Sequence, residues 1–277
     1  MRPRFVERKR HSEASPQEEW IYGVNPVLEA LAAGRNVKTL YISAGRHDRV
    51  GQILGEARTR RIPVETPDTL FFDSRFPKGH QGVAAKVAQK GYTDLHELLM
   101  IPSERGETPL FLVLDSVEDP RNFGAILRSA DASGVHGVVI QSHRSAGVGP
   151  QASKSSAGAV EHMAVSVVPN IKHAIRRMKD EGITVVGTEA DATTTLWDVD
   201  LSVPLCIVIG SEGKGMRMTV KEQCDIVAGL PMKGRINSLN VSVASGVVLF
   251  EVFRQRFAKI RTNSEFGEHN EDNKSFS

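Results

Sequence analysis

The stretch from residue 230 to residue 245 reads LPMKGRINSLNVSVAS and joins a short apolar strand to a long helix. The apolar run Asp225 to Leu230 stops at a proline and a glycine, and a helical pattern follows over 239–260. Where a strand end turns into a helix start, backbone N–H and C=O groups are free to meet a ligand. Ser238 and Asn240 add a hydroxyl and an amide at this point, so the stretch is a candidate part of a binding site.

A second segment of the same character lies earlier in the chain. An apolar strand predicted over 111–114 ends at Asp115, a polar loop follows, and a helix is predicted over 123–133. Asn122 stands at the start of this helix, and Arg128 lies almost two turns further on, on roughly the same face. Arg128 is therefore a candidate anion-binding residue.

The third segment, GSEGKGM at 210–216, follows an apolar strand predicted over 206–209. Its glycines allow a flat ligand to approach the backbone, and Glu212 stands at the tip. Ligands of open α/β sheets bind at the carboxyl edge, where strands end. Three such loops in one half of the chain predict a single ligand crevice.

Each of these residues also has a purely structural explanation. Asn122 and Ser238 are favoured helix N-cap types, Arg128 can be an exposed helix residue, and 210–216 can be a plain turn. Asp115 is more readily a loop-shaping residue than half of a paired acid and base.

The composition is that of an ordinary soluble globular protein, with 40% hydrophobic and 25% charged residues among 277. No run approaches a membrane helix, and the N-terminus shows no secretory signal. The two cysteines have no metal-binding spacing and fit reduced thiols of a cytoplasmic protein. We expect neither a membrane nor a metal partner. The net charge of +2 does not by itself indicate nucleic acid.

The sequence divides into a basic flexible arm (1–18), a small α/β unit (19–89), an interdomain linker (90–108), a second α/β unit (109–261) and a flexible tail (262–277). In the second unit, short apolar strands alternate with helices, which predicts a mostly parallel sheet covered on both faces.

The usual catalytic and nucleotide-binding signatures are missing. The chain has no P-loop, no dinucleotide Gly-x-Gly-x-x-Gly, no Gly-x-Ser-x-Gly and no His-Glu-x-x-His. Its nine histidines show no ligand pairing. None of these signatures explains the chain better than the three strand-end loops do.

The three loops together resemble the three motifs of the SpoU (TrmH) family of RNA ribose 2′-O-methyltransferases. The matching segments are 122–130, 209–216, and 230–232 followed by 238–244. The opening 22–31 resembles that of the family's small substrate-binding domain. Residues 144–146 and 156–161 resemble the RlmB branch, which methylates a guanosine of 23S rRNA.

The resemblance implies a SPOUT trefoil-knot domain over 109–261 and an L30e-like domain over 19–89. It also implies bound S-adenosylmethionine, a homodimer with the site at its interface, and 23S rRNA as partner. By position in the motifs, the catalytic residues would be Asn122, Arg128, Glu212, Ser238 and Asn240. The cofactor would contact Gly210, Leu230 and Leu239, with Thr188 as a further candidate.

We expect Arg128 to bind the RNA phosphate and to stabilise the developing alkoxide. It is not expected to act as the base, because a guanidinium stays charged. Ser238 and Asn240 would fix the loop and the ribose. Two alternatives stay open at this point. One is the same chemistry on tRNA, and the other is a non-catalytic RNA-binding or ribosome-assembly module.

Overall fold

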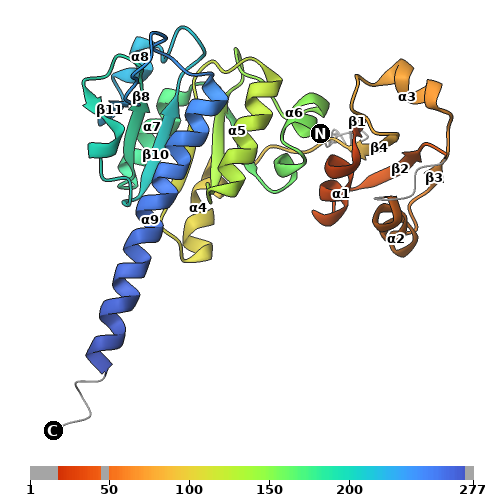
Figure 1. Cartoon of the computed structure of the whole chain (residues 1–277), viewed down its shortest axis with the longest axis horizontal. Coiled ribbons are helices and arrows are strands. Elements are labelled where there is room, and N and C mark those ends of the chain that lie inside the picture. Colours follow the sequence, from red (N-terminus) through yellow and green to blue (C-terminus); the bar gives the residue numbers. More distant parts are fainter. Residues whose placement is uncertain (1–17, 45–49, 272–277) are drawn as a thin grey trace, which may run out of the picture.

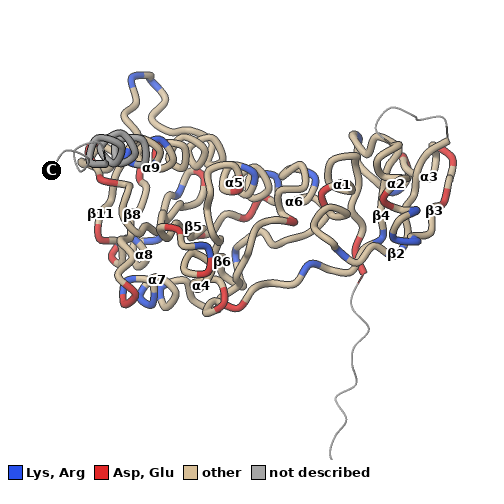
Figure 2. The backbone as a smooth tube through the Cα atoms, turned by 90° about the horizontal axis from the view of Figure 1, so that it is seen from below, with Lys and Arg blue, Asp and Glu red and all other residues tan. Residues whose placement is uncertain are grey.

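The computed structural model describes residues 18–44 and 50–271, with side chains as far as residue 259. It contains two α/β units and a long C-terminal helix, α9, which extends beyond the second unit (Figure 1). The predicted basic arm lies outside the described residues except for Glu18, which begins β1. Acidic and basic positions alternate along the backbone of both units in the view of Figure 2.

The first unit is a four-stranded sheet in the order β1-β4-β2-β3, in which β4 is antiparallel to both β1 and β2. Its strands are β1 (Glu18–Tyr22), β2 (Val37–Ile42), β3 (Val64–Glu65) and β4 (Val83–Ala88). Its helices are α1 (Val24–Ala32), α2 (Val50–Arg60) and α3 (Thr69–Arg75). The likeness of this unit to L30e stays a prediction.

The segment 90–108, predicted as an interdomain linker, contains helix α4 (Leu95–Arg105). The Asp94 side chain caps this helix by accepting a hydrogen bond from the His96 N–H at 2.8 Å. Leu98 and Leu99 are buried in the core of the second unit. Their spacing from Leu95 puts all three on one helix face, so the segment had an apolar side that needed covering.

The second unit is a seven-stranded sheet in the order β7-β6-β5-β10-β8-β11-β9, and every pairing in it is parallel. The strands are β5 (Leu110–Leu114), β6 (Gly137–Gln141), β7 (Ala164–Val168), β8 (Thr184–Thr188), β9 (Thr194–Thr195), β10 (Leu205–Ile209) and β11 (Ile226–Gly229). The helices are α5 (Pro120–Ala132), α6 (Pro150–Ser155), η1 (Ala159–Glu161), α7 (Ile171–Asp180), η2 (Leu196–Asp198), α8 (Met218–Lys221) and α9 (Val241–Glu271). The predicted mostly parallel α/β fold is confirmed.

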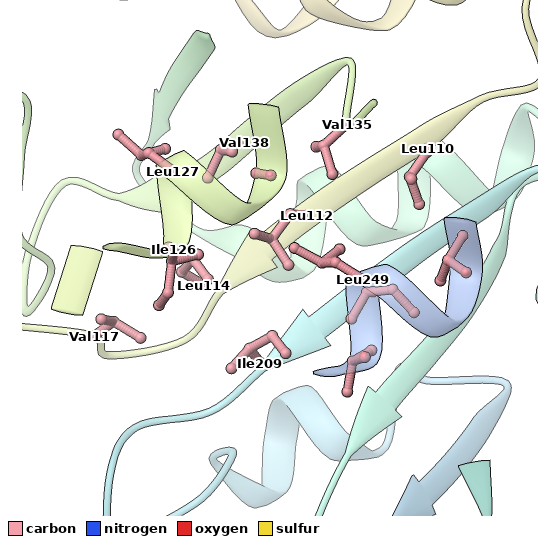
Figure 3. Packing of buried hydrophobic residues seen from close by; sticks show 14 of the residues in the cluster. Leu110, Leu112, Leu114, Val117, Ile126, Leu127, Val135, Val138, Ile209 and Leu249 are labelled. Carbon is pink, nitrogen blue, oxygen red and sulfur yellow. The ribbon is translucent and has the colours of Figure 1, made fainter. Parts of the chain in front are cut away.

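Alternating side chains of β5 serve two hydrophobic cores, one on each face of the sheet. Leu110, Leu112 and Leu114 pack against Ile126 of α5 and Leu249 of α9 (Figure 3). Phe111 and Val113, on the opposite face, belong to the core with α4 and α7. Because both faces are covered, all five residues of the strand are buried, as in other parallel sheets.

Strand order brings three distant loops together. β10 lies between β5 and β8, and β11 lies next to β8, so the loops after these strands share one edge of the sheet. The predicted trefoil knot stays a prediction.

Helix α9 begins at Val241, two residues after the predicted start, and continues through Glu271. The helix thus extends into the predicted flexible tail (262–277) as far as residue 271, and residues 272–277 lie outside the described chain. The flexibility of the tail stays a prediction. No proline interrupts 241–271, so nothing in the backbone stops the helix earlier.

A buried charge network joins the two units. The Arg35 guanidinium pairs with Glu19 of β1 and, at 2.6 Å, with Glu161 of the second unit. The Arg35 and Glu161 side chains are only 8% and 2% exposed. Lys90 adds a hydrogen bond from its ammonium group to the Glu161 carbonyl at 2.7 Å.

Candidate active site

A cavity of about 410 Å³ lies at the shared edge of the sheet, between the loops after β8, β10 and β11 and the start of α9. Its wall includes the apolar side chains of Ile209, Ala228 and Val248, and its polar lining includes Glu189 and Ser238. A second cavity of about 280 Å³ adjoins it and shares part of its lining. The space can take a ligand that has both a flat apolar part and polar groups.

The four predicted cofactor-contacting residues all line this cavity. Thr188 ends β8, Gly210 follows β10, Leu230 follows β11, and Leu239 precedes α9. Gly210 is required for steric reasons, because a Cβ there would lie 2.2 Å from backbone atoms of Gly215 and Met216. Four loop segments between residues 188 and 239 thus line one cavity.

Three predicted catalytic residues form a hydrogen-bonded group at this edge. The Asn122 side-chain amide donates to Glu212 Oε2 at 3.2 Å. The Asn240 amide donates to Asn122 Oδ1 at 3.2 Å and to Glu212 Oε1 at 3.3 Å. We call Asn122, Glu212 and Asn240 the polar triad. Glu212 also lines the cavity, so the triad borders the candidate ligand site.

The capping explanations for Asn122 and Ser238 do not hold. The N-cap of α5 is Asp119, which accepts a hydrogen bond from the Arg121 N–H at 2.8 Å. The side-chain hydrogen bond from Arg121 also lowers the pKa of Asp119 below its ordinary value. At α9 the capping acceptor is Asn240, whose Oδ1 receives the Ser242 N–H at 3.0 Å. Ser238 lies in the cavity lining instead.

Arg128 is not brought into this group within one chain. Six residues advance a helix by about 600°, which turns Arg128 about 120° away from Asn122. The prediction that they share a face was therefore wrong. Arg128 is exposed on α5, outside the cavity lining, and no hydrogen bond or ion pair to another described residue is seen for it.

Sequence reasoning missed Glu189 and Arg217. Glu189 lines the cavity, and its Oε1 accepts a hydrogen bond from the Met216 N–H at 2.7 Å. Arg217 binds the buried Asp115 carboxylate, with Nε 2.7 Å from Oδ1. The position of Glu189, just after a strand that leads to the ligand edge, is the signal that could have revealed it.

Among the described residues, no group of three or more His, Cys, Asp and Glu side chains could hold a metal ion. None of the helices in the described ranges is long and apolar enough to cross a membrane.

Two family models match the two units. Residues 109–250 match the SpoU rRNA methylase family, and residues 20–93 match the RNA 2′-O-ribose methyltransferase substrate-binding family. The chain is 44% identical over 247 residues to the 23S rRNA (guanosine-2′-O-)-methyltransferase RlmB of Pseudomonas aeruginosa, covering 87% of this chain and 98% of that protein. It is 40% identical over 243 residues to a Bacillus subtilis protein, YacO, with a provisional family-level name, TrmH family tRNA/rRNA methyltransferase, covering 87% and 98% of the two chains.

Solved structures agree with these matches. The SpoU methyltransferase AviRb of Streptomyces viridochromogenes, in complex with S-adenosylmethionine, superposes with a TM-score of 0.73 at 28% identity, over 87% of this chain and 91% of that one. An S-adenosylmethionine-bound rRNA methyltransferase of Sinorhizobium meliloti gives 0.70 at 26% identity, over 86% and 87%. Because the family model, the sequence identity and the structural similarity all agree, the chain belongs to the SpoU family of S-adenosylmethionine-dependent RNA ribose 2′-O-methyltransferases.

Proposed function

We propose that this protein transfers a methyl group from S-adenosylmethionine to the ribose 2′-hydroxyl of a guanosine in 23S rRNA. The observation that carries the proposal is the polar triad at the edge of the cavity, formed by residues up to 118 positions apart. The similarity to an RlmB protein over 98% of that protein's length supports the choice of RNA and base.

The cavity fits the cofactor. Thr188, Gly210, Leu230 and Leu239 would hold it against the apolar wall, where backbone atoms are accessible because Gly210 has no side chain. When bound, S-adenosylmethionine supplies a methyl group already activated by its sulfonium. The protein therefore has to position the ribose and accommodate the hydroxyl proton, and well-oriented reactants are worth up to roughly 7–11 kcal/mol.

The polar triad gives this positioning a structural basis. Glu212 accepts hydrogen bonds from both amides, so its carboxylate is fixed at the edge of the cavity. Ser238 is exposed in the same lining and would orient the ribose. Arg128 would bind the neighbouring phosphate with its planar guanidinium and stabilise the developing alkoxide while the hydroxyl proton passes to solvent water.

Because Arg128 lies outside the triad of its own chain, we propose that Arg128 of the partner subunit completes each site in a homodimer. Helix α9 has a row of exposed apolar side chains, Val243, Val247, Phe250, Phe253 and Phe257, that are 39–52% exposed. The rings of Phe250, Phe253 and Phe257 contact one another in sequence. Helix α5, which carries Arg128, packs beside α9 in the same layer (Figure 1). A second copy seated on this row would cover it and bring its Arg128 close to the site.

The first unit would select the RNA. It matches the substrate-binding family over 20–93. A tRNA-modifying TrmH/SpoU enzyme of A. aeolicus aligns with only 60% of this chain, although 83% of that enzyme is covered. The additional unit favours a substrate other than that of the smaller tRNA enzymes, and RNA in folded loops is recognised by shape and stacking.

The test is to map 2′-O-methyl groups in rRNA and tRNA from a strain that lacks the gene, by nuclease digestion and mass spectrometry. One guanosine of 23S rRNA should lose its methyl group, and the purified protein should restore it in vitro. Loss of a methyl group from tRNA instead would support the tRNA alternative. Unchanged rRNA and tRNA, with no cofactor binding, would support a non-catalytic ribosome-assembly role.

A further inference from the structure

The loop from Ser211 to Arg217, which we call the cofactor loop, folds back onto the end of β10. The N–H of Ser211 donates to the Gly215 carbonyl and the N–H of Gly215 to the Ser211 carbonyl, both at 3.0 Å. The backbone of Gly215 and Met216 runs so close to Gly210 that a Cβ there would lie 2.2 Å from it. The returning arm of the loop is therefore fixed to the strand end, and Glu212, Gly213 and Lys214 lie between the two fixed points.

Two carboxylates hold the returning arm from opposite sides. Glu189 follows β8 and accepts the Met216 N–H at 2.7 Å, and Asp115 follows β5 and accepts the Arg217 N–H through Oδ2 at 2.8 Å. β5 and β8 are the two neighbours of β10 in the sheet. Consecutive N–H groups of the loop are thus tied to the strands on either side of the one that carries it.

Asp115 makes the stronger of these two attachments. Its side chain is fully buried, and its Oδ1 accepts the Arg217 Nε at 2.7 Å in addition to the backbone contact. Arg217 continues to the Gln141 Oε1 at the end of β6, at 2.7 Å. A buried carboxylate is tolerated only when it is paired and hydrogen-bonded, and Arg217 provides both.

Asp115 acts at a distance from the ligand. It is not among the residues that line the cavity, and the hydrogen bonds of the polar triad do not include it. Its contacts instead fix the loop that places Glu212 against Asn122 and Asn240 and supplies part of the cavity wall.

We infer that Asp115 is a positioning residue for methyl transfer and that Arg217 is the group through which it acts. Asp115 holds the cofactor loop in the form that binds S-adenosylmethionine and presents Glu212. The inference rests on the proposed roles of the cavity and of Glu212.

The experiment compares Asp115→Asn, Arg217→Ala and Arg217→Lys with the unaltered protein at a temperature well below each melting temperature. S-adenosylmethionine affinity is measured by calorimetry, and kcat and KM by methyl transfer to rRNA from the deletion strain. We expect Arg217→Ala to raise the Kd for S-adenosylmethionine about tenfold and to lower kcat. Both Arg217 variants keep the backbone N–H that Asp115 accepts, but Arg217→Lys also keeps a positive charge, so it should recover part of the lost affinity and part of the lost kcat.

Leu31→Ala is the control, because Leu31 is fully buried in the core of the first unit, which contains no residue of the cofactor loop or of the cavity lining. It should lower the melting temperature and leave the Kd unchanged. If Asp115 had only a structural role, Asp115→Asn and the two Arg217 variants would likewise lower the melting temperature without changing the Kd. Kd and kcat values within twofold of the unaltered protein in all three variants, with lower melting temperatures, would overturn the inference.

The two proposals can fail separately. If the unaltered protein binds S-adenosylmethionine but does not methylate 23S rRNA, the RNA target is wrong, and the Kd comparison still tests Asp115. Arg217 is partly exposed, so Arg217→Lys provides the comparison if Asp115→Asn does not fold. Absence of cofactor binding by the unaltered protein would overturn both.

Discussion

The side-chain amide of Asn240 donates a hydrogen bond to Oδ1 of Asn122 across 3.2 Å, although 118 positions separate the two residues. The same amide also reaches Glu212, and the Asn240 oxygen caps α9. One residue therefore connects the start of the last helix to the loops after β5 and β10.

Glu212→Gln should lower kcat by about 10² or more while changing S-adenosylmethionine affinity less, because the new side-chain amide keeps one acceptor oxygen but puts an N–H donor against one of the two amide donors. Single-turnover methyl transfer and cofactor calorimetry separate the two effects. Glu222→Gln, an exposed carboxylate of the same unit, is the control and should retain normal turnover. Normal turnover in Glu212→Gln as well would remove this residue from the mechanism.

Gly210→Ala should abolish measurable cofactor binding and lower stability. The new Cβ would lie 2.2 Å from backbone of Gly215 and Met216, so the cofactor loop must move, and overpacking of this kind costs about 1–3 kcal/mol or more. Calorimetry and thermal unfolding measure both effects. Gly55→Ala in α2 meets nothing within 4 Å and should be neutral or slightly stabilising. An unchanged Kd in Gly210→Ala would mean that the loop does not form the cavity wall.

Arg35→Ala should destabilise the protein by about 3–5 kcal/mol, because it leaves the buried Glu161 carboxylate without its cation. Denaturant unfolding followed by circular dichroism gives the loss. The control is Arg60→Ala, which removes an exposed pair with Glu56 and should cost less than about 0.5 kcal/mol. Equal effects of the two substitutions would show that the charge network between the units contributes nothing.

Burial raises the pKa of the Cys224 thiol from 9.0 to about 11, and burial also raises that of Cys206. A raised folded-state pKa stabilises the protein below the unfolded-state value. That stability is lost as the pH rises from about 9 toward 11, at up to about 1.4 kcal/mol per pH unit for each thiol. Urea unfolding at successive pH values should show this fall, and Cys224→Ala should make it shallower.

In the native state at pH 8, both thiols should react slowly with an aromatic disulfide reagent. Rapid reaction of Cys224 would contradict its burial.

The strands and the candidate site were predictable where local pattern decides them. The strands predicted over 111–114 and 206–209 are β5 and β10, each of which begins one residue earlier than predicted and ends at the predicted residue. The strand-end loops at Asn122, Gly210 and Asn240 meet as expected, because parallel strands end at the same edge. The sequence could not reveal that Asp119, rather than Asn122, caps α5, since several residues of that loop can accept the same N–H groups.

Other features depend on partners far along the chain. Helix α4 lies within the predicted linker, where a short apolar face and the internal Pro102 give only a weak helical pattern, and the core of the second unit explains how the helix packs. The Asp115–Arg217 pair spans 102 residues, so no local pattern reports it. Arg128 is a third case, since the group it is proposed to serve belongs to another subunit.

If Arg128 of one subunit completes the site of the other, two inactive variants should complement each other. Arg128→Ala and Asn240→Ala should each be inactive alone, because one removes the phosphate-binding cation and the other breaks the polar triad. In an equimolar mixture that exchanges subunits, half of the dimers pair one chain of each kind, and one of their two sites then has every residue intact. Activity should return to about one quarter of the unaltered level.

Adding Phe253→Asp to both chains should prevent the recovery, because it puts a charge in the exposed apolar row of α9, whereas Leu70→Asp, on the first unit, should not. Light scattering confirms the assembly state in each case. No recovery in a mixture shown to contain mixed dimers would place Arg128 in the site of its own chain.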